Sequence, residues 1–264
     1  MDLGLDQKRV AITGSSRGIG LALAQAFLEE GARVMLNGLD PGRLEEARDR
    51  FAGFGDRVTA VAADVSRRSG VERLFEEIDR TWGGVDVFVN NAATHPTSDF
   101  TVLEEEQWNE LMDMNLKSAY LCAQAAFQRM KNQESGGVIL NASSFAALIP
   151  AYPYGLYSLS KAALISMTKT MAAEFAPWNI RVNAYVPGLI ATQMNAETIE
   201  KNGDVALAQI ALMRPGSVEE VAAPVVFLAS SKASYISGAA LEISGGKFAV
   251  QHPKATWNPA RTGG

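Results

Sequence analysis

The residues of this sequence best suited to acid–base chemistry are a tyrosine and a lysine four positions apart, Tyr157 and Lys161. Residues four apart on a helix share a face, so an ammonium group can lie beside the phenol and stabilise its ionised form. An ordinary tyrosine has a pKa of about 10 and is a poor base at neutral pH. We therefore expect Lys161 to lower the pKa of Tyr157, although the same spacing also occurs on solvated helices that have no catalytic role.

Ser144 precedes this pair, in the stretch Asn141-Ala142-Ser143-Ser144. A serine hydroxyl held near the tyrosine can donate a hydrogen bond to the oxygen of a reacting carbonyl or alcohol. The three side chains together indicate proton transfer at a carbon–oxygen bond. Ser144 can also simply cap a turn, and that alternative stays open.

A glycine-rich turn near the N-terminus is the second chemical signal. Residues 9–12 are typical of a short buried strand and run into Thr13-Gly14-Ser15-Ser16-Arg17-Gly18-Ile19-Gly20, and a helical pattern follows from Leu21 to Glu30. Glycines let backbone N–H groups approach a pyrophosphate, and a helix N-terminus adds partial positive charge. The spacing differs from the general dinucleotide fingerprint, so a tight turn without a ligand remains the alternative.

The composition is that of an ordinary globular protein. The 264 residues are 47% hydrophobic and 20% charged, with a net charge of −5 and no block of like charges, so we expect neither a nucleic-acid nor a membrane partner. The first residues lack the layout of a signal peptide, which favours a cytoplasmic location. A single cysteine, Cys122, and two distant histidines, His95 and His252, predict no internal disulfide and no metal site.

Short β-branched runs alternate with helical patterns along the chain. This alternation predicts an α/β fold: one doubly wound domain over residues 1–264, with a seven-stranded, mostly parallel sheet and helices on both faces. Ligands of such folds bind at the carboxyl ends of the strands, where each chemical motif falls. The expected strands are residues 10–12, 33–36, 58–62, 85–89, 138–141, 180–185 and 241–243.

In the order of its motifs, the chain resembles the short-chain dehydrogenases/reductases of the common short type, which have a Rossmann-type fold. Besides the glycine loop and the Tyr157/Lys161 pair, the resemblance rests on Asp64-Val65, Asn90-Asn91-Ala92-Ala93, Met114-Asn115-Leu116-Lys117 and Pro187-Gly188-Leu189-Ile190-Ala191-Thr192. It extends to about Gly246. Two departures are Ala93, where the family usually has glycine, and Ser244, where many relatives have aspartate.

The resemblance implies an NAD(P)-dependent oxidoreductase that interconverts a secondary alcohol and a ketone by hydride transfer. Tyr157 would be the general acid or base, and Lys161 would lower its pKa and hold the nicotinamide ribose. Ser144 would polarise the substrate oxygen, and Asn115 would anchor a water that links Lys161 to solvent. The alternative function is a catalytically silent NAD(P)-binding regulator that senses redox state, but it has no use for all four of these side chains.

The cofactor-binding residues implied by the resemblance lie in every motif. They are Gly14, Ser16, Arg17, Gly18, Ile19, Gly20, Asn37, Asp64, Val65, Asn91, Ala92, Tyr157, Lys161, Pro187, Gly188, Ile190 and Thr192.

The position after the second strand bears on the choice of cofactor. NAD-preferring relatives have an aspartate where this chain has Gly38, so no carboxylate repels a 2′-phosphate there. Arg17 and Asn37 are expected to bind that phosphate, which favours NADP. Leu39 stands where relatives with an Asn-Gly turn often have arginine, and Asp40 can reach the ribose hydroxyls, which leaves NAD as the alternative.

Substrate specificity is expected to come from loops. His95, Pro96, residues 145–154 and residues 193–213 are the expected pocket, and residues 193–215 have the pattern of a substrate lid with a helix. This mostly apolar pocket, without an arginine cluster, predicts a medium-sized neutral alcohol, ketone or sugar-like polyol.

Residues 247–264 form a C-terminal extension beyond the resemblance. The extension is either disordered or lies across a neighbouring subunit with Trp257 as its anchor. Because the family is commonly dimeric or tetrameric, the resemblance implies a homo-oligomer, with a homotetramer as our expectation.

Overall fold

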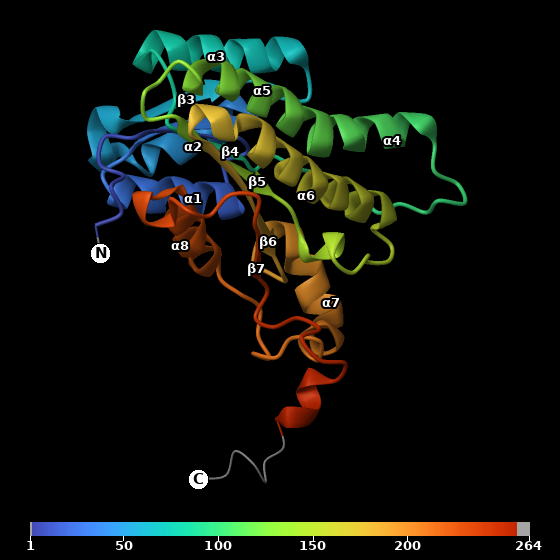
Figure 1. Cartoon of the computed structure of the whole chain (residues 1–264). Helices are drawn as coiled ribbons and strands as arrows, with labels where there is room; N and C mark the ends of the chain where they lie inside the picture. Colours follow the sequence, from blue (N-terminus) through green and yellow to red (C-terminus); the bar gives the residue numbers. More distant parts are fainter. Residues whose placement is uncertain (1, 258–264) are drawn as a thin grey trace.

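The computed structural model describes residues 2–257. Within them, seven strands form one sheet in the order β3-β2-β1-β4-β5-β6-β7, and every pairing is parallel (Figure 1). The strands are β1 Arg9–Ile12, β2 Arg33–Gly38, β3 Val58–Ala62, β4 Val87–Asn90, β5 Gly137–Ala142, β6 Ile180–Pro187 and β7 Ala240–Ile243. The prediction of one doubly wound α/β domain with seven strands is confirmed.

In the described part of the chain, eight α-helices connect and cover the strands. They are α1 Gly18–Glu29, α2 Pro41–Asp49, α3 Arg68–Trp82, α4 Glu105–Met112, α5 Ser118–Met130, α6 Gly155–Phe175, α7 Ala196–Leu207 and α8 Val218–Ala229. A π-helical turn, Asp113–Lys117, joins α4 to α5. Short 3₁₀ turns are Ala52–Arg57, Phe145–Ala147, Ala176–Trp178, Gln193–Asn195, Ser231–Ala233 and Pro253–Thr256.

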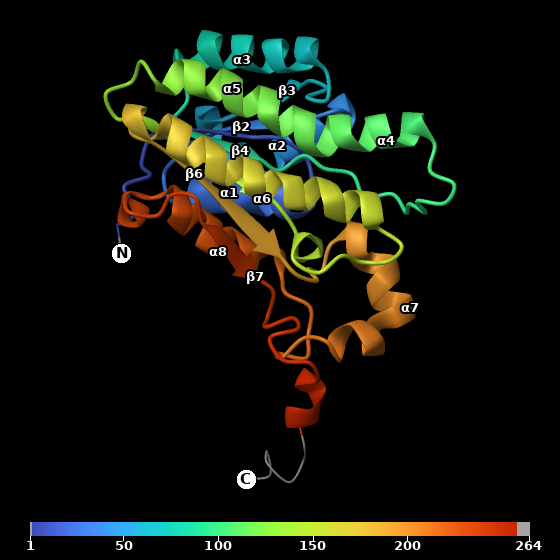
Figure 2. The ribbon, with the colours of Figure 1, turned by 45° about the vertical axis from the view of Figure 1, so that its right-hand side comes forward.

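Helices lie on both faces of the sheet, which explains why its strands are apolar on both sides. Figure 2 shows α1 and α8 on one face and α3, α5 and α6 on the other. Leu23 and Phe27 of α1 pack with Val225 of α8 in the first layer of core. Phe75 of α3 and the fully buried Cys122 of α5 belong to the second layer.

The strand order creates a crevice at the carboxyl edge of the sheet. β1 lies between β2 and β4, so the connections after β1 and β4 leave toward opposite sides of the sheet. Ligands of open α/β sheets bind at such a switch point. The glycine loop follows β1, and Asn91 follows β4, so both motifs meet there.

The segment after β7 folds back onto the segment after α7. Lys247 forms an antiparallel bridge with Ile210, and the indole N–H of Trp257 donates to the carbonyl oxygen of Ala211 at 2.8 Å. Trp257 is therefore anchored on its own chain, a contact that neither of the two alternatives for the extension, disorder or packing across a neighbouring subunit, had included. Residues 258–264 of the predicted extension lie outside the described residues.

Among residues 2–257, the structure contains no helix that combines the length and the apolar character needed to cross a bilayer.

Candidate active site

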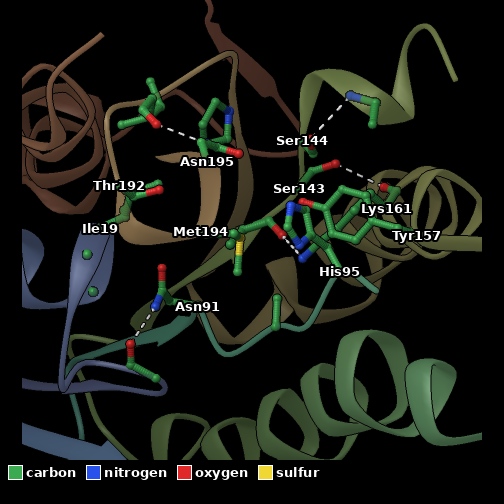
Figure 3. A pocket seen from close by; sticks show the side chains of 18 of the residues that line it. Ile19, Asn91, His95, Ser143, Ser144, Tyr157, Lys161, Thr192, Met194 and Asn195 are labelled. Carbon is green, nitrogen blue, oxygen red and sulfur yellow. Dashed lines mark hydrogen bonds between the residues drawn. The ribbon is translucent and has the colours of Figure 1, made fainter. Parts of the chain in front are cut away.

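One cavity of about 730 Å³ opens at the carboxyl ends of the strands. Nearly all of the predicted site residues line it, from the glycine loop at one end to Ser144, Tyr157 and Lys161 at the other (Figure 3). Of the predicted catalytic and cofactor-binding residues, Asp64 and Asn115 are outside its lining, and so are Pro96, Ala147, Leu148 and Pro153 of the expected substrate pocket. The sequence thus predicted most of the cavity wall, although the contacts of several residues differ from the expectation.

The glycine loop has the geometry of a phosphate cradle. Gly14 has a φ of +63°, and a Cβ added to Gly20 would lie 2.4 Å from the carbonyl oxygen of Gly14. Helix α1 begins at Gly18, and its cap residue Arg17 gives the first-turn N–H groups no side-chain acceptor. These donors therefore lie at the cavity with the positive end of the helix dipole, and they fit the pyrophosphate of a dinucleotide.

A partly buried hydrogen-bond network holds this loop against β4. The Asn91 side-chain amide donates to the carbonyl oxygens of Thr13 and Gly14, both at 3.0 Å, and the Tyr185 hydroxyl donates to Asn91 Oδ1 at 3.1 Å. Asn91 thus positions the loop. Sequence reasoning missed Tyr185, for which the available signal was a phenol inside an otherwise apolar strand.

Tyr157 and Lys161 lie on one face of α6, as their spacing predicts. Lys161 is only 2% exposed, and its Nζ donates to the carbonyl oxygen of Ala142 at 2.7 Å. The same Nζ lies 5.6 Å from the centre of the Tyr157 ring. The Ser143 hydroxyl donates to the Lys161 carbonyl oxygen at 2.9 Å and ties β5 to α6.

The expectation that Lys161 lowers the pKa of Tyr157 is wrong for the protein by itself. Burial raises the pKa of Tyr157 above its usual value, and the neighbouring Ser144 hydroxyl partly offsets the increase. Burial also lowers the pKa of Lys161 to about 8. Desolvation disfavours the charged form of both groups, and that effect dominates here. Tyr157 is therefore a protonated phenol at neutral pH, ready to donate a proton.

Ser144 caps a turn, which is one of the two roles considered for it. Its hydroxyl oxygen accepts from the backbone N–H of Ala146 at 3.2 Å and so caps the short turn after β5. The hydroxyl also lies beside Tyr157. The cap fixes the Ser144 side chain, which leaves its proton free for a substrate oxygen.

Asn115 lies in the π-helical turn between α4 and α5 and is almost fully buried. Its Oδ1 accepts from the backbone N–H of Thr94, and its Nδ2 donates to the Thr94 carbonyl oxygen, both at 2.8 Å. Nδ2 also lies 3.3 Å from Ser160 Oγ. Asn115 therefore clamps the chain after β4 to α6, which agrees with the frequent occurrence of π-turns at functional sites.

At the adenosine end, two predicted contacts differ in the structure. Asn37 is 1% exposed, and its amide donates to the carbonyl oxygens of Val61 and Ala63, both at 3.1 Å, so this side chain has no free hydrogen for a phosphate. The Asp64 carboxylate accepts from the N–H and hydroxyl of Ser66. Both side chains stabilise the sheet edge, while the neighbouring Val65 lines the cavity.

At this end of the cavity, the side chains that can bind an anion are two arginines, since the amide of Asn37 is already used within the sheet. Arg17 and Arg43 line the cavity together with Gly38. Arg17 Nη1 donates to Gln193 Oε1 at 3.1 Å, and Arg43 Nε lies 3.5 Å from a carboxylate oxygen of Asp40. Asp40 itself caps α2 by accepting from two backbone N–H groups. Sequence reasoning did not single out Arg43.

Aromatic and polar side chains form the substrate end. The His95 ring stacks on Tyr154, with centroids 5.0 Å apart, and meets the Tyr157 ring edge-on at 5.6 Å. Burial lowers the pKa of His95, so its imidazole is neutral at pH 7. On the wall after Ser144, Phe145 packs against Phe248 of the C-terminal segment.

The remaining predicted residues lie where their motifs placed them. Ser16, Ile19 and Ala92 line the cavity near the glycine loop, and Pro187, Gly188, Ile190 and Thr192 line it after β6. The Asn195 amide donates to the Ile190 carbonyl oxygen at 2.9 Å, which connects this loop to the beginning of α7 (Figure 3).

Comparison with known proteins agrees with this geometry. The family model described as enoyl-(acyl carrier protein) reductase matches residues 14–247. The chain is 38% identical to an L-rhamnose 1-dehydrogenase (NAD(P)(+)) from Azotobacter vinelandii, over 92% of this chain and 98% of that protein.

Two solved structures show the same fold. L-sorbose reductase from Gluconobacter frateurii, complexed with NADPH and L-sorbose, matches with a TM-score of 0.89 and 35% identity, over 95% of this chain and 100% of that one. A short-chain type dehydrogenase/reductase from Mycobacterium marinum matches with a TM-score of 0.89 and 33% identity, over 94% and 99%. With a family model that spans most of its length and relatives of this identity, the chain belongs to the short-chain dehydrogenase/reductase family of NAD(P)-dependent oxidoreductases.

Proposed function

We propose that Tyr157 transfers the proton in an NAD(P)-dependent interconversion of a secondary alcohol and a ketone. The observation that carries this proposal is the position of Tyr157, Ser144 and Lys161 at one end of a cavity whose other end is the glycine loop. A bound nicotinamide supplies or accepts the hydride, which no side chain can do.

Each side chain has a role that follows from its environment. Tyr157, kept protonated by burial, donates its proton to the carbonyl oxygen during reduction. The Ser144 hydroxyl donates a hydrogen bond to the same oxygen as negative charge develops on it. Lys161, with a pKa of about 8, is mostly protonated at pH 7 and can hold a ribose hydroxyl near Tyr157.

NADP is the proposed cofactor, with NAD as the alternative. Support comes from Arg17 and Arg43 in the cavity wall beside Gly38, where a 2′-phosphate would meet two guanidinium groups. Arg17→Ala and Arg43→Ala should each raise KM for NADP about 10-fold and leave KM for NAD within about twofold, since one charged hydrogen bond is worth about 1.5–3 kcal/mol. Arg50→Ala, an exposed arginine just after α2, is the control.

Residues 193–215 are the proposed lid. Gln193, Met194, Asn195 and Thr198 line the cavity, and the Arg17–Gln193 hydrogen bond connects the lid to the glycine loop. The helical part is shorter than the expected segment, since α7 ends at Leu207 and the chain then pairs with the segment after β7.

A homotetramer is the proposed assembly. Helices α4, α5 and α6 each present an exposed large apolar or aromatic side chain, Trp108, Tyr120 and Leu159, which agrees with a subunit interface on these helices. Light scattering should give four times the 28.3 kDa mass of the chain. A mass equal to one chain would contradict this part of the proposal.

A medium-sized polar alcohol, in particular a sugar-like polyol, is the proposed substrate class. Two relatives are named for sugars, rhamnose and sorbose. The neutral His95 imidazole beside Tyr157 can donate to or accept from a substrate hydroxyl. The direct test is a panel of polyols, sugars, hydroxy acids and their ketones with NADP and NAD, followed by nicotinamide absorbance. Lack of turnover with every member would contradict the proposed function.

A further inference from the structure

A lysine from the C-terminal segment, Lys247, lies in the wall of the cavity near the catalytic residues. Its Nζ is 5.3 Å from the centre of the Phe145 ring and 5.9 Å from that of Phe248. Phe145 directly follows Ser144, and both line the same cavity as Lys247. The sequence had predicted a mostly apolar pocket without an arginine cluster, and it did not indicate this lysine.

The backbone around Lys247 is fixed by contacts on both sides. The Lys247 N–H donates to Ser244 Oγ at 3.2 Å, and the Phe248 N–H donates to the Gln209 carbonyl oxygen at 2.8 Å. Gly245 and Gly246 both have positive φ, so the chain turns sharply just before Lys247. These contacts hold the backbone of Lys247 at the cavity wall, so the binding of a ligand by its side chain does not require this segment to become ordered.

Within residues 2–257, no carboxylate forms an ion pair with Lys247. The side chain is half-buried, and burial lowers its pKa. The aromatic rings attract the ammonium group but do not neutralise its charge. A partly desolvated cation without a counter-ion at a cavity wall is stabilised by an anionic ligand group.

We propose that Lys247 binds a carboxylate of the substrate, so that the substrate is a polyhydroxy acid or its keto acid. The inference rests on the proposed function and narrows its substrate class. A single lysine without an arginine partner matches a singly charged carboxylate better than a phosphate, which arginines bind in bidentate fashion.

The carboxylate takes no part in the reaction. In the oxidation direction, the phenol of Tyr157 first releases its own proton to solvent, and its oxygen then accepts the proton of the substrate hydroxyl. The C–H bond at the alcohol carbon breaks in the same step, and a bound oxidised nicotinamide would accept the hydride. The product is the keto acid with its carboxylate unchanged. Lys247 only orients the carbon chain of the substrate. The substrate hydroxyl that faces Tyr157 is therefore at a fixed distance from the substrate carboxylate.

The test compares matched probes that differ in one group. Five- and six-carbon aldonates are paired with the corresponding alditols, in which CH₂OH replaces the carboxylate, and kcat and KM are measured with NADP and NAD. The wild-type protein should prefer the aldonate by at least about 10-fold in kcat/KM. Lys247→Met should lower kcat/KM for the aldonate about 10- to 100-fold, mainly through KM, and leave that for the alditol within about twofold.

Two further variants separate binding from packing. Lys247→Arg keeps the charge and should retain most of the aldonate preference, while Lys254→Met, an exposed lysine on the same segment, should behave as wild type. A purely structural role for Lys247 would lower the thermal stability and affect both probes equally. Isothermal titration of the cofactor-loaded protein with aldonate adds a readout that does not require turnover.

The inference is overturned if the wild-type protein does not prefer or bind aldonates, or if Lys247→Met affects aldonate and alditol alike. Preference for a sugar phosphate over the aldonate would also overturn it. In each case Tyr157-dependent turnover of a neutral alcohol would leave the proposed function intact, so the two failures are distinguishable.

Discussion

Replacing Lys161 with methionine should change the stability of the protein in a pH-dependent way. Burial lowers the pKa of Lys161 from 10.5 to about 8. Between these values the unfolded chain binds a proton that the folded chain does not, so folding of the wild-type protein becomes more favourable as the pH rises. The unfavourable contribution of Lys161 to the free energy of folding has its full size well below pH 8 and disappears above pH 10.5. Methionine does not titrate, so the variant lacks this dependence.

The size of the effect follows from the two pKa values. A difference from 10.5 to about 8 corresponds to roughly 3 kcal/mol of unfavourable free energy at low pH. By linkage, nearly all of it, about 3 kcal/mol, remains at pH 7.5, and less than half of it, roughly 1 kcal/mol, remains at pH 9.5. The wild-type free energy of unfolding, minus that of Lys161→Met, should therefore increase by roughly 2 kcal/mol between these pH values.

The assay is urea unfolding of both proteins at pH 7.5 and 9.5, at one protein concentration. The variant also loses the hydrogen bond to the Ala142 carbonyl oxygen, which offsets part of its gain in stability at both pH values. The quantity to compare is therefore how the difference in the free energy of unfolding between the two proteins changes with pH. Lys169→Met, which removes an exposed lysine from the same helix, is the control and should show no such change. A difference that stays constant within about 0.5 kcal/mol would refute the reasoning. Lys161→Met should also be folded but inactive.

Other predictions follow from the same geometry. Gly20→Ala places a Cβ 2.4 Å from the Gly14 carbonyl oxygen and should weaken NADP binding at least about 10-fold in a fluorescence titration. Gly53→Ala is the control, since an added Cβ there has no atom within 4 Å, and it should bind NADP as wild type does. Equal binding by the two variants would argue against the phosphate cradle. Asn115→Ala should lower the free energy of unfolding by about 2–3 kcal/mol, because it leaves the backbone N–H and carbonyl oxygen of Thr94 without their partner. A loss below about 0.5 kcal/mol would mean that this contact between Asn115 and Thr94 is dispensable for stability. Burial raises the pKa of Cys122, so a thiol reagent should label it in urea and leave it unmodified in the native protein; rapid native labelling would contradict its place in the core.

The fold could be predicted because its signals are local. Each strand is a short apolar run between helical patterns, and only the ends differ from the expectation. β4 begins at Val87, two residues later than expected, and the carboxylate of Asp86 just before it accepts hydrogen bonds from the backbone and side chain of Arg9. β6 continues to Pro187, which pairs with Ile243 of β7 and needs no N–H of its own on that side.

The site could be predicted as a set of residues but not as a set of contacts. Asn37 was expected to bind phosphate, but β3 supplies two carbonyl oxygens that use its amide, and this pairing depends on sheet order. The pKa of Tyr157 depends on desolvation by the packed fold, which spacing on one helix does not show. Lys247 reaches the cavity only because the chain after β7 folds back along residues 209–212.

The measurement that tests the central claim most directly is turnover by Tyr157→Phe, together with its affinity for NADP. The account predicts that the variant binds NADP within a few-fold of wild type and loses at least about 10³-fold in kcat, because the ring remains and only the proton donor is removed. Turnover within about 10-fold of wild type would contradict the assignment of Tyr157 as the acid–base group.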